Sequence, residues 1–143
     1  MNGRKFDFSD EGVSLDIPEQ GKKLRPVKRP TGKLEDMKSK PGGFTPWRLV
    51  INFEMEEEDN PGSYISEFEK PLELRIRYTR ADHERAEKDG KPLRMAYWDG
   101  SDWVVFTAEK HQFKRVPAAD AKSGGELVVS LSKWADPTIA VGR

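Results

Sequence analysis

The sequence contains no cysteine and no long hydrophobic run. Without cysteine the chain cannot form a disulfide, a thiolate nucleophile or a cysteine-ligated metal site. No stretch approaches the roughly 18 apolar residues that a membrane-spanning helix needs, so no membrane insertion is expected. Residues 1–11 also lack the apolar segment of a signal peptide. As written, the chain is expected in the cytoplasm; as a fragment of a larger exported protein, it is expected outside the cytoplasm.

Net charge is also absent, because 25 lysine and arginine residues equal 25 aspartate and glutamate residues. Nucleic-acid-binding proteins normally carry a basic patch that neutralises phosphates, so no nucleic-acid partner is expected. Balanced charge, together with 4 Trp, 7 Phe and 3 Tyr, also argues against a disordered chain. The composition predicts a single folded domain over residues 1–143 with a densely charged surface.

Apolar and polar residues alternate with a period of two in several segments, which is the pattern of half-buried strands. Charge occupies the second face of the longer segments, as an antiparallel sheet with one solvated face requires. The apolar positions of these segments are Val13, Leu15 and Ile17; Trp47, Leu49, Ile51, Phe53 and Met55; Leu72, Leu74, Ile76 and Tyr78; Leu127, Val129 and Leu131; Ile139 and Val141.

Two strand-like runs flank a tight connection at residues 99–102, where Gly100 is available for a positive φ angle. Folding a hairpin about this connection pairs Trp98 with Trp103. Trp98, Trp103 and Val105 then share the face opposite to the core. The pattern therefore predicts a hairpin with an aromatic pair on its second face.

A short polar helix is predicted over residues 80–89. Thr79 and Asp82 have the spacing of a capping box, and Gly90 suits the left-handed end of a helix. Residues 18–46 are rich in proline, glycine and lysine and predict a long irregular crossing, with a short edge strand near residues 24–27.

The segment Glu109–Arg115, which contains His111, is predicted to be a charged edge strand. Together these elements predict an all-β fold, an immunoglobulin-like antiparallel sandwich of seven to nine strands with one short surface helix. A β-barrel is the alternative.

The second half of the chain carries a recognisable order of motifs. A strand at residues 74–79 is followed by the polar helix and then by a hairpin with Trp-Asp-Gly at residues 98–100 and Trp-Val at residues 103–104. The last motif is the segment 134–141, which ends in a strand. Over residues 71–142, about half the chain, this resembles an uncharacterised bacterial β-sandwich module, loosely similar to ZU5-type domains. The resemblance implies a scaffolding and interaction unit without shared catalytic residues.

Residues that could carry chemistry are few. Glu56, Glu58 and Asp59 lie in an acidic run that is a weak candidate for calcium, but they lack the spacing of an EF-hand loop. A solvated acidic loop is the favoured interpretation, so no metal and no cofactor are expected. His83 and His111 have no serine in a nucleophile-elbow motif with which to form a hydrolase triad.

The tryptophans are the most useful indication of function. Trp98, Trp103 and Val105 are the candidate contact face of a non-enzymatic interaction or structural module that binds another protein or a second copy of itself. For the rings themselves a structural role is the favoured interpretation, in which they cover the second sheet or pack under the proline-rich crossing. A carbohydrate-binding module that uses the same tryptophans is the second function, and a hydrolase with carboxylate catalysis is the third.

Overall fold

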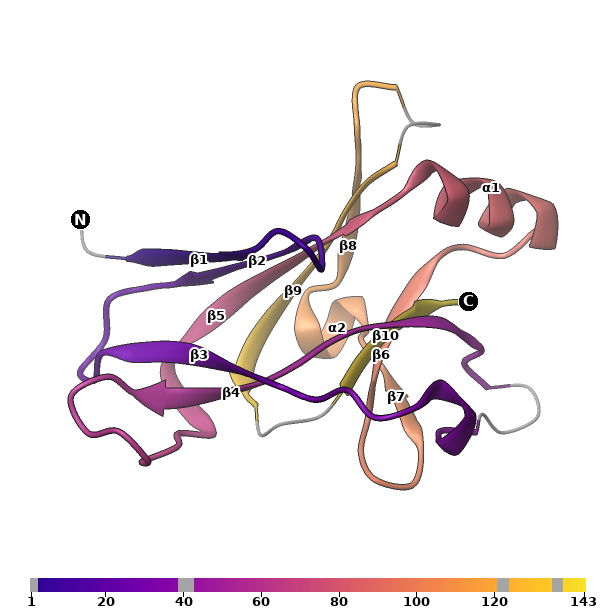
Figure 1. Cartoon of the computed structure of the whole chain (residues 1–143). Helices are drawn as coiled ribbons and strands as arrows, with labels where there is room; N and C mark the ends of the chain where they lie inside the picture. The colour runs from indigo at the N-terminus through magenta and orange to yellow at the C-terminus, as the bar shows by residue number, and fades with distance from the viewer. Residues whose placement is uncertain (1–2, 39–42, 121–123, 135–137) are drawn as a thin grey trace.

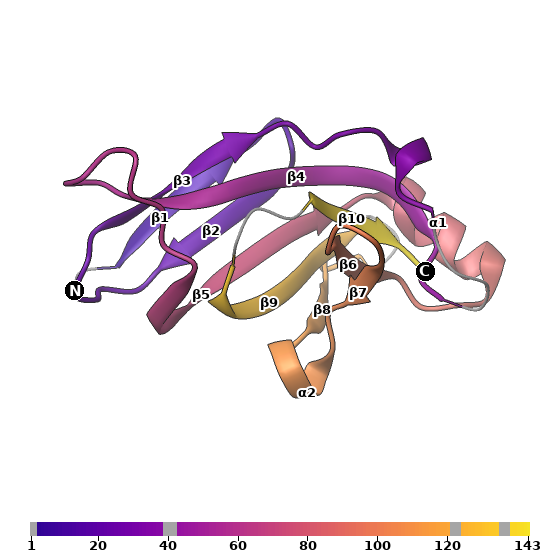
Figure 2. The same ribbon diagram turned by 90° about the horizontal axis from the view of Figure 1, so that it is seen from below.

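The structure, a computed structural model, describes residues 3–38, 43–120, 124–134 and 138–143. These residues form ten strands in two antiparallel five-stranded sheets, which pack face to face as a sandwich, and two short α-helices (Figure 1). Figure 2 shows the two layers from the side, with β3 and β4 in one layer and β2, β5 and β9 in the other. The mostly β architecture predicted from the alternating segments is confirmed.

The first sheet has the strand order β1-β2-β5-β9-β8, and every neighbouring pair is antiparallel. Its strands are β1 (Arg4–Phe8), β2 (Val13–Ile17), β5 (Glu67–Tyr78), β8 (Lys114–Pro117) and β9 (Gly125–Lys133). The structure has more strands than the predicted seven to nine because the sequence did not predict β1. This edge strand has only two apolar residues, so its alternating pattern is weak.

The second sheet has the order β3-β4-β10-β6-β7 and is also antiparallel throughout. Its strands are β3 (Leu24–Arg29), β4 (Pro46–Glu57), β6 (Arg94–Trp98), β7 (Trp103–Val105) and β10 (Thr138–Gly142). The predicted hairpin is confirmed, because Trp98 pairs with Trp103 in the β6–β7 ladder. Asp99 Oδ1 accepts hydrogen bonds from the Ser101 and Asp102 amides, which fixes the turn, and Gly100 has the expected positive φ of 107°.

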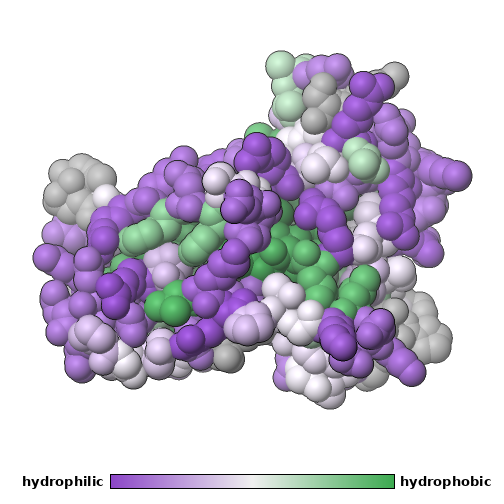
Figure 3. All heavy atoms as spheres, viewed as in Figure 1, coloured by the Kyte–Doolittle hydropathy of each residue, from purple (hydrophilic) through white to green (hydrophobic). Residues whose placement is uncertain are grey.

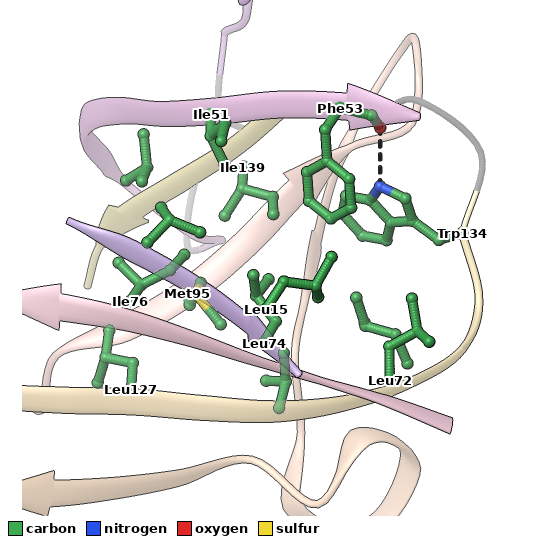
Figure 4. Close-up of a cluster of buried hydrophobic side chains, with 14 of the residues drawn as sticks. Leu15, Ile51, Phe53, Leu72, Leu74, Ile76, Met95, Leu127, Trp134 and Ile139 are labelled. Carbon is green, nitrogen blue, oxygen red and sulfur yellow. Dashed lines mark hydrogen bonds between the residues drawn. The ribbon is translucent and has the colours of Figure 1, made fainter. Parts of the chain in front are cut away.

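The core lies between the inner faces of the two sheets (Figure 4). The predicted apolar positions of β2, β5, β9 and β10 are all buried there, which confirms the period of two in these strands. Trp134, directly after β9, reaches across the core: its Nε1–H donates to the Phe53 carbonyl of β4 at 3.0 Å, and its ring stacks on the Phe53 ring at 5.2 Å. This indole therefore joins one sheet to the other.

Strand β4 departs from the predicted alternation. Ile51 pairs with Ile139, but Leu49 pairs with Ala140, so a β-bulge at Val50 shifts the register. One extra residue moves the following side chains to the opposite face. Leu49 therefore leaves the main core and packs on the outer side of the sheet in a second cluster with Phe44, Ala96, Ala140, Trp103 and Val105. The prediction that Leu49 faces the main core was wrong.

Helix α1 (Arg80–Asp89) confirms the predicted polar helix together with both of its ends. Thr79 accepts a hydrogen bond from the Asp82 amide, Asp82 accepts one from the Thr79 amide, and Gly90 adopts the left-handed conformation. Asp82 is buried, and its carboxylate also accepts two hydrogen bonds from Arg48 of β4, at 3.2 and 2.6 Å. The helix that connects the two sheets is thus tied to β4.

A second helix, α2 (Ala108–His111), replaces the first part of the predicted edge strand Glu109–Arg115. The Thr107 hydroxyl accepts a hydrogen bond from the Lys110 amide, and a serine or threonine in this position initiates a helix in spite of charged residues that follow. Gln112 then ends the turn at φ 52°, and the strand begins only at Lys114. The prediction that His111 lies in a strand was therefore wrong.

The proline-rich crossing passes over the outer side of the second sheet. It supplies edge strand β3, as predicted, and then a 3-10 turn, η1 (Leu34–Asp36). Two side chains of the sheet bond to its main chain: Thr138 Oγ1 donates to the Thr31 carbonyl at 2.8 Å and Trp103 Nε1 to the Met37 carbonyl at 2.9 Å. The crossing therefore covers part of this sheet.

Charged residues dominate the molecular surface. On the side shown in Figure 3, apolar residues form a band across the middle of the face, and charged residues border it. Many charges are paired, as Arg29 is with Glu54 at 2.7 Å and Arg75 with Glu73 at 2.8 Å. Within the described residues, neither helix has the length and apolar character that crossing a membrane would take.

Replacing Asp82 with asparagine tests how α1 is held. Burial raises the pKa of Asp82, but hydrogen bonds from Arg48 and Thr79 outweigh burial, so the pKa lies below its ordinary value of 3.8. A carboxylate with a lowered pKa stabilises the fold above its unfolded pKa and loses this contribution as pH falls through the folded pKa. Asp82→Asn should therefore lower the free energy of unfolding by about 1–3 kcal/mol at pH 7. Urea denaturation at several pH values measures this difference.

The difference between wild type and Asp82→Asn should shrink as the pH drops below 3.8. Glu84→Gln is the matched control, because Glu84 bonds only to exposed Arg80 on the same helix. It should change stability by less than about 0.5 kcal/mol. A loss that stays constant from pH 7 to pH 3 would contradict this account of Asp82.

Candidate functional site

A cleft of about 760 Å³ lies at one end of the sandwich. Four aromatic residues from three parts of the chain line it: Tyr97 and Trp98 of β6, Phe106 after β7, and Trp134 after β9. A cleft of this volume lies within the range of about 300–1,000 Å³ that is typical of ligand sites. We call it the aromatic cleft.

The rings of the aromatic cleft support one another. Phe106 lies 5.3 Å from Tyr97 and 6.3 Å from Trp134, and Tyr97 meets Trp134 edge-on at 6.0 Å. Trp134 and Phe106 are buried, whereas Tyr97 and Trp98 are only half-buried. Trp134 is also anchored to Phe53, so the buried wall of the cleft is continuous with the core.

Polar residues form the remaining walls. The end of β9 supplies Ser130, Ser132 and Lys133, and α2 supplies Lys110 and His111. Glu67 and Ser66 border the cleft at the start of β5, and Asp99 and Gly100 border it at the hairpin. A cleft with aromatic rings and hydrogen-bonding groups suits a ligand that has both apolar and polar parts.

His111 contributes an imidazole N–H donor to the cleft wall rather than a positive charge. Burial lowers the pKa of His111, and the charge of Lys110 lowers it further, so the ring is neutral at pH 7. Its Nδ1 accepts a hydrogen bond from the Thr107 amide at 3.2 Å, so the proton lies on Nε2. The ring also meets Phe106 edge-on at 4.9 Å. His111 therefore borders the cleft in a fixed orientation and as a fixed tautomer.

The carboxylates of the cleft are already engaged. Asp99 Oδ1 accepts hydrogen bonds from the Ser101 and Asp102 amides, and Glu67 lies 3.7 Å from the Lys133 ammonium group. General acid and base catalysis requires a carboxyl group that is directed at a substrate.

The β6–β7 register keeps the three residues of the predicted contact face on one side of the sheet: Trp98 pairs with Trp103, and their rings meet edge-on at 5.3 Å. Trp103 and Val105 pack in the second cluster on the outer side of the sheet, and Trp98 also borders the aromatic cleft. Trp103 lies 5.6 Å from Phe44 and bonds to the Met37 carbonyl, so it lies partly under the crossing.

The weak calcium candidates lie at and just beyond the C-terminal end of β4, and two of them are paired with arginine side chains. Glu56 accepts hydrogen bonds from the Gly62 amide and from Arg25, and these bonds lower its pKa. A hydrogen bond from Arg4 lowers the pKa of Glu58, and Asp59 is exposed. Across the ranges that the structure describes, no three His, Asp or Glu side chains gather in a way that suits a metal ion.

No protein-family model, no curated protein and no solved structure matches this chain. The function must therefore be inferred from the geometry of the aromatic cleft. Sequence reasoning found Trp98 through the hairpin pattern. It did not find Tyr97, Phe106, Trp134 and His111 as neighbours, because only the folded arrangement of the two sheets brings them together.

The protonation state of His111 is directly measurable. Two-dimensional ¹H–¹⁵N NMR of the imidazole nitrogens should show the Nε2–H tautomer at pH 7 and a titration midpoint below 6.5. The His111→Gln variant assigns the signals, because the chain has only two histidines. An Nδ1–H tautomer, or a midpoint at or above 6.5, would contradict this account of the cleft wall.

Proposed function

We propose that the chain is a non-enzymatic interaction module that binds a partner protein, or a second copy of itself, in the aromatic cleft. The observation that supports this proposal is a cleft that two half-buried aromatic residues, Tyr97 and Trp98, border together with the buried Phe106 and Trp134. Tyrosine and tryptophan are enriched at the energetic centres of protein interfaces, since they bury a large area and lose little conformational entropy.

The character of the other walls agrees with this proposal. Serine hydroxyls, the His111 N–H and lysine ammonium groups surround the rings, and a protein segment offers both apolar side chains and main-chain acceptors to such a site. The immunoglobulin-like character of the sandwich and its resemblance to ZU5-type interaction modules belong to the same proposal. Such sandwiches present binding surfaces on a rigid scaffold.

A carbohydrate-binding module is the second candidate. The observation that favours it is the combination of the Trp98 and Tyr97 rings with three serine residues, Ser66, Ser130 and Ser132, around one cleft. Aromatic faces stack on the apolar faces of sugar rings, and hydroxyl groups bond to those of the sugar. The two candidates use the same residues and differ in the ligand.

Selection of random peptides displayed on phage, with the full chain immobilised, tests the proposed function. Peptides that bind wild type should bind Trp98→Ala at least tenfold more weakly, a loss of about 1.4 kcal/mol, because a half-buried aromatic ring that borders the cleft is removed. The affinities are measured by fluorescence anisotropy. Ser132→Trp, which fills the cleft from an exposed position on β9, should have the same effect.

Tyr64→Ala is the control, because Tyr64 is also an exposed aromatic residue but does not line the cleft. Its binding should stay within twofold of wild type, and circular dichroism should show that all three variants remain folded. Peptides that bind Trp98→Ala and wild type equally would refute the proposal. Binding to a polysaccharide array that depends on Trp98, with no peptide selected, would replace it with the second candidate.

A further inference from the structure

Strand β9 is longer than the strand that pairs with its outer edge. The ladder between β8 and β9 runs from Pro117 opposite Gly125 to Lys114 opposite Val128. Strand β9 continues to Lys133. Beyond Val128, therefore, no strand in the described part of the chain pairs with this edge of β9. In Figure 1, α2 lies next to the start of β8, and Figure 2 shows it standing out from the body of the sandwich.

The hydrogen-bonding pattern shows which residues direct their main chain to this edge. The Ala118 amide donates to the Gly124 carbonyl at 2.9 Å, which continues the ladder by one bonded pair. Bonded pairs alternate in an antiparallel ladder, so Glu126 and Val128 also direct their main-chain groups toward β8. The same alternation directs those of Ser130 outward.

The opposite edge of β9 gives the same result independently. The Arg77 amide of β5 donates to the Gly12 carbonyl at 2.8 Å, so Arg77 bonds toward β2. Its neighbour Ile76 therefore bonds toward β9, where it is paired with Leu127. Leu127 and, by alternation, Leu131 bond toward β5. Ser130 and Ser132, which lie on either side of Leu131, present their N–H and C=O groups to the open edge.

A hollow lies on each side of this open edge. The aromatic cleft lies on the inner side, and a second groove of about 350 Å³, lined by Gln112, Lys114 and Glu73, adjoins it. Ser130 borders both hollows. Successive side chains of a strand point to opposite faces, so a strand placed along this edge would direct alternate side chains into the cleft and into the groove.

The charges around the edge favour one kind of segment. Lys110 in the cleft and Lys114 in the groove form no ion pair with any other described residue. The acids that line the two hollows are engaged: Glu67 lies 3.7 Å from Lys133, Glu73 lies 2.8 Å from Arg75, and Asp99 accepts hydrogen bonds from two amides of the hairpin turn. The charge that is left to meet a ligand is positive, and it complements an acidic segment.

We propose that the partner contributes an extended acidic segment that adds as a strand to the edge of β9 at Ser130–Lys133, with an apolar side chain in the aromatic cleft. This inference rests on the proposed function and names the partner's chemistry. Main-chain hydrogen bonds supply affinity in this mode of binding, and the two hollows supply selectivity for alternate side chains. The edge is short, so the segment that binds it is also short.

A pair of capped heptapeptides tests this proposal with the full chain, by fluorescence anisotropy. The acidic peptide Glu-Leu-Glu-Phe-Glu-Val-Glu should bind at least tenfold more tightly than its counterpart with lysine in place of every glutamate. Lys110→Gln combined with Lys114→Gln should weaken binding of the acidic peptide at least threefold at low salt. Lys5→Gln, at an exposed position of β1 far along the sheet, is the control and should have no effect.

Main-chain methylation distinguishes strand addition from simple insertion of a side chain. Two versions of the acidic peptide carry N-methyl groups, one at the odd residues and one at the even residues. One version should lose at least tenfold in affinity, and the other should stay within threefold, because only one set of amides faces β9.

The outcomes separate the inference from the proposed function. Equal losses for the two methylated peptides, equal affinity for the acidic and basic peptides, or no binding of either peptide would overturn the strand-addition proposal. The proposed function would still stand if phage selection gives peptides whose binding depends on Trp98. Failure of that selection would overturn the proposed function itself.

Discussion

The indole of Trp134 is the contact on which the described arrangement most depends. It leaves the end of β9 in one sheet, donates a hydrogen bond to the Phe53 carbonyl of β4 in the other, and stacks on the Phe53 ring. A buried N–H without this partner would cost about 1–3 kcal/mol, so the bond fixes how the two sheets meet. The same ring supports Phe106 and Tyr97, and the wall of the aromatic cleft is therefore a continuation of the core.

Charged residues make up 35% of the chain, and they must remain outside the apolar core of the sandwich. On the outer faces and edges many of them form ion pairs between neighbouring strands, such as Arg29 with Glu54 and Arg75 with Glu126. Exposed pairs contribute little to stability, so their effect is mainly solubility and protection of the strand edges. The buried pair of Arg48 with Asp82 differs, because it ties the crossover helix to the second sheet. Beside β9, Lys110 and Lys114 form no ion pair with any described residue, and they border the two hollows at the edge of this strand.

Much of the fold was predictable because local chemistry and tertiary structure agree there. Leu72 to Tyr78 alternate as a strand and lie in one; the Thr79 and Asp82 capping box begins a helix as its spacing indicates. The prediction failed where a single residue changes the register. Nothing in the sequence marks Val50 as a bulge, and that bulge moves Leu49 to the other face. The helical turn before His111 depends on one hydroxyl, that of Thr107.

The aromatic cleft could be predicted only in part. The hairpin pattern identified Trp98, but Trp134 and His111 become its neighbours only when β9, α2 and β6 are assembled. The open edge of β9 was likewise not predictable. It exists because β9 is longer than its neighbour β8, and a sequence pattern does not show where a paired strand stops.

The most direct test of this account is the solvent accessibility of the tryptophan indoles, measured by NMR with a soluble gadolinium chelate. Trp98 should relax fastest, since it is half-buried beside the cleft, and Trp134 and Trp103 should be protected because their N–H groups bond to carbonyls of Phe53 and Met37. Protection of Trp98 equal to that of Trp134 would mean that the cleft is closed, and would contradict the assignment of this surface to ligand binding.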